Sequence, residues 1–112
     1  MILPNREKAF IPAAKLSDYL LSTSHSVGGS KARFFREFGF KEANASSLEA
    51  GLLSIARTEE VFMVTPSPFG VKYTVDGTLI TPTGITVNVR TVWIIETGEN
   101  VPRFVTAHPL PR

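Results

Sequence analysis

The chain has 112 residues, of which 43% are hydrophobic and 20% are charged, and it carries a formal net charge of +2. These proportions are those of an ordinary globular protein, and the length fits one domain over residues 1–112. The chain contains no cysteine, which excludes disulfide frameworks and thiolate metal sites. So small a net charge does not by itself indicate a nucleic-acid binder.

Expectations about location and cofactors follow from what the sequence lacks. No apolar stretch approaches the roughly 20 residues that span a bilayer. The first ten residues (MILPNREKAF) lack the basic-then-apolar pattern of a secretory signal. We therefore expect a cytoplasmic protein that makes no membrane contact. The two histidines and the scattered acids show no metal-ligand spacing, so the sequence predicts neither a metal nor another cofactor.

The first half of the chain carries three helix signals. Pro12 can occupy the first position of a helix, and Leu16 and Leu20 recur at helical spacing. This pattern predicts a helix over about residues 12–21. A polar loop with two adjacent glycines follows it, and this loop contains His25.

The second helix signal is rich in phenylalanine. Ser30 is a good N-cap residue, and Gly39 is a good residue to end the helix. Between them, Phe34, Phe35 and Phe38 form an apolar stripe. We expect this stripe to be the buried face of the helix.

Basic residues accompany this stripe. No acid lies within residues 19–36, so His25, Lys31, Arg33 and Arg36 form either a basic patch that attracts phosphates or an ordinary solvated helix face. At about 100° per residue, Lys31 falls near the middle of the stripe, whereas Arg33 and Arg36 fall outside it. Lys31 therefore either leans toward whatever the helix packs on or extends along the apolar edge.

The third helix signal has two possible starts. Ser46 and Glu49 have the spacing of a capping box, and Asn44 is an alternative cap. The expected apolar face comprises Leu48, Leu52, Ile55 and Ala56.

The second half of the chain has the pattern of four strands. Strand-forming residues occupy 61–64, 71–75, 85–95 and 103–109, and residues that favour turns separate them. Helices followed by an antiparallel meander predict an α+β fold, with N-terminal helices packed on one face of a sheet of about four strands. The first of these strands is an exposed edge that could pair with a partner strand.

Alternation within the second strand predicts which of its side chains are buried. Val71, Tyr73 and Val75 should face the core, while Lys72 and Thr74 should face outward.

The last two strands carry the polar groups of greatest interest. Arg90 lies on the polar face of the third strand, and Phe104, Thr106 and His108 are expected to share one face of the fourth. The third strand is apolar on both faces over residues 92–95, which indicates a bulge near Arg90 or cover by a terminal segment. We interpret these polar faces as the wall of a site.

Motifs run along nearly the whole chain: LPNREKA, KLSDYLL, H-x-x-G-G-x-K-A-x-x-F, G-x-K-Y-x-V, R-T-V-W-I-I and P-R-F-V-T-A-H-P. Together they resemble a bacterial domain family of unknown function that accompanies toxin-like and antitoxin-like genes. The closing V-T-A-H-P also resembles the T-A-Y-P ending of contact-dependent-inhibition ribonuclease toxins. Those toxins belong to the barnase–EndoU–colicin–RelE superfamily, which places helices before a four-stranded antiparallel sheet.

The second resemblance implies RNA cleavage without a metal. It implies a site made of a histidine close to a helix, a basic residue, a strand threonine and an aromatic hydroxyl. The matching positions are His25, Lys31 and Thr106. The chain departs from the pattern at His108, where those toxins carry tyrosine.

Metal-independent RNA cleavage needs a base for the 2′-hydroxyl proton, a cation for the phosphorane charge and an acid for the leaving oxygen. Histidine titrates near neutrality, so a pair of histidines can act as base and acid. In this hypothesis His108 and His25 are that pair, and Lys31 and Arg90 stabilise the negative charge. Thr106 donates a hydrogen bond to a phosphate oxygen.

Each assignment has a structural alternative. His25 can be an idle loop histidine, and His108 lies near the chain end, where disorder concentrates. Arg90 can instead pair with an acid across the sheet. The candidate acids are Asp76, Glu96 and Glu99.

The sequence therefore supports two classes of function. The first is a ribonuclease-like toxin domain that acts on RNA and has a small cognate antitoxin or immunity protein. The second is a non-catalytic module that binds protein or RNA, either as an antitoxin or accessory domain or as a degenerate toxin relative that kept the fold. The sequence does not indicate an oligomeric state.

Overall fold

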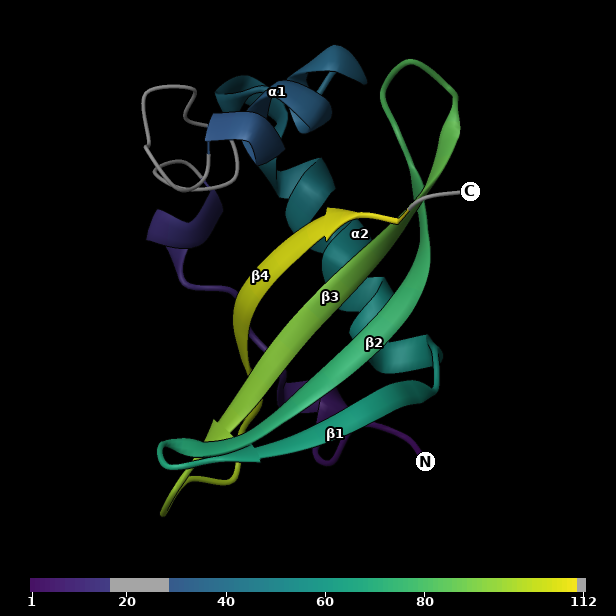
Figure 1. Ribbon diagram of the computed structural model, residues 1–112. Helices are drawn as coiled ribbons and strands as arrows, with labels where there is room; N and C mark the ends of the chain where they lie inside the picture. The colour runs from purple at the N-terminus through teal and green to yellow at the C-terminus, as the bar shows by residue number, and fades with distance from the viewer. Residues whose placement is uncertain (17–28, 111–112) are drawn as a thin grey trace.

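Four consecutive strands form one antiparallel sheet in the order β1-β2-β3-β4. The computed structural model describes residues 1–16 and 29–110, and its elements are shown in Figure 1. The strands are β1 (Val61–Ser67), β2 (Gly70–Ile80), β3 (Thr86–Glu96) and β4 (Arg103–Pro109). The helical elements that precede them are η1 (Arg6–Lys8), α1 (Gly29–Glu37), η3 (Glu42–Asn44) and α2 (Ala45–Thr58).

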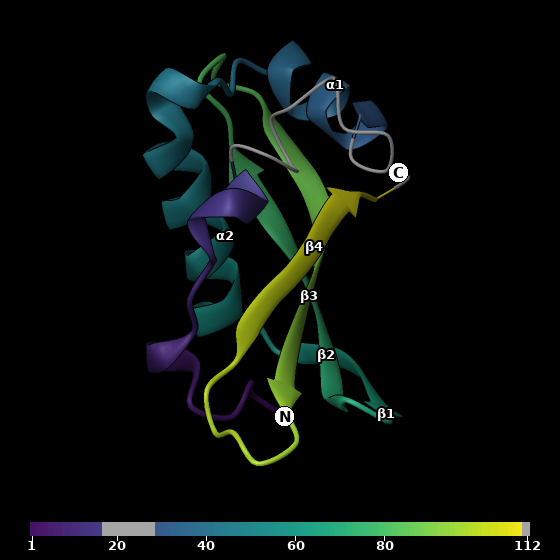
Figure 2. The ribbon, with the colours of Figure 1, turned by 90° about the vertical axis from the view of Figure 1, so that its left-hand side faces the viewer.

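Helix α2 runs along one face of this sheet, and α1 lies near the far end of β4 (Figures 1 and 2). The predicted α+β architecture, with helices before the strands and on one face of the sheet, is confirmed. The other face of the sheet is turned toward the viewer in Figure 1, with α2 behind it. Within the described residues, no helix is long and apolar enough to cross a membrane.

The core lies between α2 and the sheet. Leu48, Leu52, Ile55 and Ala56 form the buried face of α2, as the sequence predicts. They pack in one cluster with buried side chains of β2 and β3, which are Val75, Leu79, Val89 and Trp93. A side chain at Gly77 would bring a Cβ atom to 2.9 Å from the Ile55 side chain. Glycine is therefore required there for α2 to approach the sheet so closely.

One buried hydroxyl organises the polar groups of this core. Thr91 is fully buried, and its Oγ1 donates a hydrogen bond to the Val75 carbonyl at 2.6 Å. The same oxygen accepts a hydrogen bond of 2.8 Å from Nε1 of Trp93. Trp93 can therefore be fully buried without leaving its indole N–H unsatisfied.

The helix starts differ from their predicted positions by one or two residues. Helix α2 starts at Ala45 with Asn44 in the N-cap position, so the alternative start is right and Ser46 lies inside the helix. Helix α1 starts at Gly29, which places Ser30 within its first turn rather than at the cap. Gly39 adopts a positive φ of 98° after α1, as expected for the residue that ends a helix.

The predicted first helix can be followed only in part. Residues 13–16 are helical, and the rest of the predicted range of about 12–21 lies outside the described residues. The preceding segment makes a bridge between Phe10 and Arg103, so it runs beside the outer edge of β4. Trp93 and the next residue, Ile94, are both buried, so β3 is buried on both faces there, as the apolar run over residues 92–95 indicates.

A bulge in β4 changes the face on which its residues lie. Phe104 pairs with Trp93 and Thr106 pairs with Val92, so Val105 is the extra residue. The prediction that Phe104 shares a face with Thr106 and His108 is therefore wrong. Phe104 is fully buried against Trp93, with ring centroids 5.3 Å apart. One inserted residue reverses the order of inward and outward side chains along a strand.

A second irregularity lies in β1, where the register shifts between Val61 and Met63. Thr74 lies on the predicted face of the sheet, away from α2, where it pairs with Met63 and Val92. It is nevertheless only 5% exposed, so the prediction that it faces solvent is wrong. Its central position among neighbouring strands accounts for the burial.

Candidate active site on the open face of the sheet

The face of the sheet away from α2, here called the open face, carries a row of polar residues. Asp76 of β2 lies directly opposite Arg90 of β3, and Arg90 lies directly opposite His108 of β4. The adjacent row on β3 and β4 contains Val92 and Thr106. Residues in one row of an antiparallel sheet have Cβ atoms about 5 Å apart. The structure thus brings together Arg90, Thr106 and His108, three of the residues that the sequence singles out.

Arg90 is held by a two-point ion pair. Its Nε donates to Oδ1 of Asp76 at 2.8 Å, and its Nη2 donates to Oδ2 at 2.9 Å. Both side chains are about one-quarter exposed, at 28% and 26%. The hydrogen bonds to Asp76 raise the pKa of Arg90 above its ordinary value, and the negative charge of the carboxylate adds to the effect. Arg90 is therefore a permanent cation with a fixed orientation.

An aromatic ring covers the same guanidinium. The Cζ atom of Arg90 lies 4.6 Å from the centre of the Phe62 ring, within the range of a cation–π contact. Phe62 falls at the register shift of β1, which accounts for its position over the open face. Phe62 is 63% exposed, so the ring shields one side of Arg90 while remaining accessible itself.

This geometry limits the electrostatic role of Arg90. The ion pair uses Nε and Nη2, so Nη1 takes no part in the contact with Asp76. Asp76 neutralises most of the charge of Arg90 at long range, but a phosphate that reaches Nη1 still meets an oriented donor. Among the acids considered from the sequence, Asp76 is the partner of Arg90, whereas Glu96 pairs with Arg103.

His108 and Thr106 are both half-buried in the last part of β4. They are two residues apart beyond the bulge, so both lie on the open face. His108 therefore has a fixed strand position beside Arg90, in contrast to the alternative that it lies in a disordered terminus. His108 and Arg90 are thus directly opposed neighbours in one row of the sheet.

Two further candidates are only partly located. His25 lies outside the described residues, so its relation to His108 stays a prediction. Lys31 lies in the first half of α1, and its side chain is outside the described part. Helix α1 contacts β4, so the backbone of Lys31 belongs to the element packed against the strand that carries His108.

The sequence names Asp76 only as one of three possible partners of Arg90, and it does not point to Phe62 as a member of this site. A signal for Asp76 was present, because the alternation of outward-facing Lys72 and Thr74 continues to residue 76. No comparable signal existed for Phe62, because its position depends on the bulge in β1.

Comparison with known proteins supports the fold and identifies the family. The chain is similar in structure to a chain of a contact-dependent growth inhibition toxin–immunity protein complex from Klebsiella pneumoniae 342, with a TM-score of 0.74 and 15% sequence identity. The alignment covers 96% of this chain and 97% of that chain, so the two share a fold over nearly their whole lengths. A search of curated proteins found no match. A family model matches residues 2–111, and the chain therefore belongs to the family described as Domain of unknown function (DUF6883).

Proposed function

We propose that this chain is a metal-independent ribonuclease domain that acts as the toxin of a toxin–immunity pair. The observation that carries the proposal is the alignment of Arg90 and His108 in one row of the open face, with Thr106 in the next row. A cation, a group that can transfer protons and a hydroxyl donor are thereby gathered on a surface that no described helix covers.

The likeness of fold adds support for a role in a toxin system. The solved complex contains a toxin and its immunity protein, and this chain matches one of its chains over almost the full length. The closing T-A-H-P of the sequence, in which His108 replaces the tyrosine of the toxin pattern, favours the toxin rather than the immunity protein.

The proposed reaction is an attack of the RNA 2′-oxygen on the adjacent phosphorus. The 2′-hydroxyl proton passes to a base, the bond from phosphorus to the 5′-oxygen breaks, and that oxygen takes a proton from an acid. The products are a 2′,3′-cyclic phosphate and a free 5′-hydroxyl, so no metal or external cofactor is needed. His108 serves as base or acid, and His25 serves as its partner.

The remaining residues act on charge and orientation. Nη1 of Arg90 donates to a phosphate oxygen while Asp76 and Phe62 hold the guanidinium still. Thr106 donates its hydroxyl hydrogen to a second phosphate oxygen, and Lys31 adds positive charge from α1. Fixed donors directed at the developing charge supply a large part of such rate enhancements.

The test is RNA cleavage by protein made in a cell-free system, which avoids selection against a toxic product. Wild type should convert a short labelled RNA to a fragment with a cyclic phosphate end, in the presence of a chelator. His108→Ala should lower the rate by about 10²-fold or more, as expected when a group that transfers protons is removed. Equal cleavage by wild type and His108→Ala, at matched stability, would exclude His108 from the reaction.

A second candidate function is a non-catalytic module that binds a partner protein. The exposed apolar side chains of edge strand β1 favour it, because Phe62, Met63 and Val64 are 63%, 48% and 42% exposed. An exposed apolar edge strand is a typical site for pairing with another chain. The pairing of Arg90 with Asp76 also fits a structural role for that arginine.

The two candidates differ in what expression does to a cell. Inducible expression of a ribonuclease toxin should stop growth and deplete RNA, and His108→Ala should abolish both effects. A binding module should leave growth and RNA unchanged in either form. Purified wild type that is folded, harmless and inactive on RNA would favour the second candidate.

A further inference from the structure

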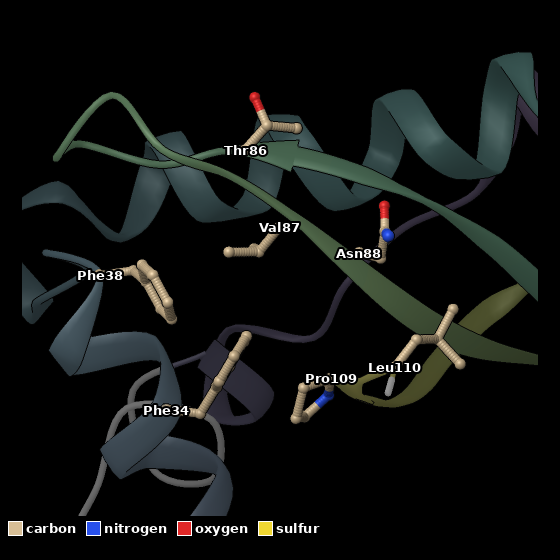
Figure 3. A pocket seen from close by; sticks show the side chains of 7 residues that line it. All are labelled: Phe34, Phe38, Thr86, Val87, Asn88, Pro109 and Leu110. Carbon is tan, nitrogen blue, oxygen red and sulfur yellow. The ribbon is translucent and has the colours of Figure 1, made fainter. Parts of the chain in front are cut away.

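A hollow lies beside the end of β4, between that strand, β3 and α1. It has a volume of about 340 Å³, near the lower end of the range for sites that hold small molecules. Its lining residues are Phe34, Phe38, Thr86, Val87, Asn88, Pro109 and Leu110. Figure 3 shows the rings of Phe34, in α1, and Phe38, directly after α1, on the side of the hollow that faces Val87 and Pro109. Pro109 directly follows His108, so the hollow adjoins the proposed active site.

The two rings offer flat apolar surfaces at different angles. Their centroids are 5.2 Å apart, and their planes are inclined by 60°. Phe34 and Phe38 are both half-buried, whereas the neighbouring Phe35 is only 1% exposed and belongs to the core. The first two rings therefore have surface left for a flat ligand, which would stack on one ring and touch the other at its edge.

The β3 side of the hollow supplies backbone hydrogen-bonding groups. The N–H of Leu110 donates to the Asn88 carbonyl at 2.9 Å, so the backbone groups of Asn88 point toward β4. Backbone groups two residues apart on a strand point the same way, so the N–H and C=O of Thr86 also point away from β2. Strand β4 ends at Pro109, opposite Val89, and among the described residues, which end at Leu110, none pairs with Thr86. The edge of β3 thus presents one donor and one acceptor beside the two rings.

A nucleobase combines the two properties that this hollow would recognise. Its faces stack on aromatic side chains, and its edge carries both donors and acceptors. Figure 3 shows the Asn88 amide on the other side of β3 from the rings, toward the open face. Asn88 precedes Arg90 by two residues, a distance of about 7 Å along a strand. Thr86 is four residues before Arg90, roughly 13 Å along the strand, so a short single strand can place a base in the hollow and a nearby phosphate beside Arg90 and His108.

We infer that the hollow is a nucleobase subsite for single-stranded RNA. It holds the base adjacent to the phosphate that is cleaved, with the base face on Phe34 or Phe38 and the base edge on the backbone of Thr86. Single-stranded RNA is the substrate class, because a base engaged in a duplex cannot present its edge and both faces. This inference rests on the ribonuclease function proposed above and defines how that site selects its substrate.

The first test changes one ring at a time. Phe34→Leu and Phe38→Leu keep an apolar side chain but remove the stacking surface, and each should lower kcat/KM for RNA about tenfold, in line with the loss of one stacked base. Phe69→Leu is the matched control, because Phe69 is 76% exposed in the connection between β1 and β2, which lies far from the hollow in Figure 1. An equal effect of all three substitutions would overturn the inference.

The second test changes the backbone edge. Thr86→Pro removes the N–H that faces the hollow, whereas Thr86→Val removes only the hydroxyl. Cleavage of RNA should fall several-fold further in Thr86→Pro than in Thr86→Val. An RNA with an abasic nucleotide at the cleavage position should react about tenfold more slowly with wild type, but at the same rate as intact RNA with Phe38→Leu. An abasic penalty of the same size in wild type and Phe38→Leu would contradict the subsite.

A binding measurement separates this inference from the proposed reaction. Uridine and adenosine monophosphates are titrated into ¹⁵N-labelled His108→Ala protein, which binds without cleaving. Amide shifts at Phe34, Phe38, Val87 and Thr86 would support the subsite even if wild type cleaves no RNA. Cleavage by wild type without nucleotide-dependent shifts around the hollow would leave the ribonuclease function standing and overturn the subsite.

Discussion

Asp76 and Arg90 face each other across β2 and β3 and are joined by two hydrogen bonds, of 2.8 and 2.9 Å. The pair is partly exposed and lies in the same row as His108. A carboxylate in this place has two opposite effects. It fixes the direction of the guanidinium, and it also cancels much of the positive charge that would attract RNA.

Substitution of Asp76 by asparagine should separate these two effects. Asp76→Asn should tighten RNA binding several-fold at low salt and steepen its salt dependence by about one phosphate contact, because Arg90 is no longer neutralised. Cleavage should nevertheless slow, because the guanidinium loses its fixed orientation. The RNA affinity is measured by fluorescence anisotropy at several salt concentrations from about 50 to about 200 mM, a range in which phosphate contacts weaken strongly with salt. Weaker binding together with an unchanged salt dependence would show that Arg90 does not contact phosphate.

Arg90 should contribute no pH dependence to cleavage. The raised pKa of Arg90 favours its protonated form, so its charge is kept at every lower pH and is lost only above its ordinary value. Arg90→Lys should therefore lower the rate but leave the shape of the pH–rate profile unchanged. His108→Gln, in contrast, should remove one limb of the profile. Initial rates from pH 5 to 9, about the range in which histidine titrates, distinguish the two. A profile that changes in Arg90→Lys but not in His108→Gln would reverse the roles.

Thr91 should be critical for stability rather than for activity. Thr91→Val keeps the shape of the side chain but leaves the indole N–H of buried Trp93 without its acceptor. An unsatisfied buried donor costs about 1–3 kcal/mol. Thr91→Ser, which retains the oxygen, should cost less than the valine variant. Urea unfolding followed by the fluorescence of Trp93 gives both values. Equal stability of Thr91→Val and wild type would show that the hydroxyl is not needed.

Two glycines with positive φ provide a matched pair for a test of close packing. A Cβ at Gly70 would lie 2.3 Å from the Ile95 carbonyl oxygen, whereas a Cβ at Gly98 would meet nothing within 4 Å. Both residues have φ values unfavourable for alanine, at 147° and 85°. Gly98→Ala should therefore cost about 1 kcal/mol from backbone strain alone. Gly70→Ala should cost clearly more, because the backbone of β3 must also move. Thermal unfolding of both variants checks the order, and a reversed order would contradict this account of the β1–β2 turn.

Much of the fold could be predicted from local patterns. The apolar spacing of Leu48, Leu52 and Ile55 marks the buried face of α2, and the alternation around Val75 marks the strand beneath it. Such patterns repeat at the period of the element, so they survive small errors in its limits. The start of α1 differs by one or two residues, which is within the usual scatter of helix limits. The start of α2 has two candidates because Asn44 and Ser46 are both acceptable caps.

The site could be predicted only in part, because it depends on pairing between strands. The sequence indicates that Arg90, Thr106 and His108 are outward-facing polar residues, but it does not indicate that Asp76 lies opposite Arg90. The position of Phe104 was wrong for a related reason. Strict alternation assumes one residue per partner, and nothing in R-F-V-T-A-H marks Val105 as supernumerary.

The extra residue in β4 gives the strand two different halves. Before Val105, odd-numbered side chains such as Arg103 are outermost and Phe104 is held within the hydrophobic interior. After Val105, the even-numbered residues face the open side of the sheet, so His108 lies on that side. A variant that lacks Val105 could still pair with β3, but its phenylalanine and its histidine would then lie on the same face of the sheet. Either the phenylalanine would be buried or the histidine would be exposed, but not both. The number of residues between Phe104 and His108, rather than the identity of the extra residue, thus determines which face of the sheet carries the histidine.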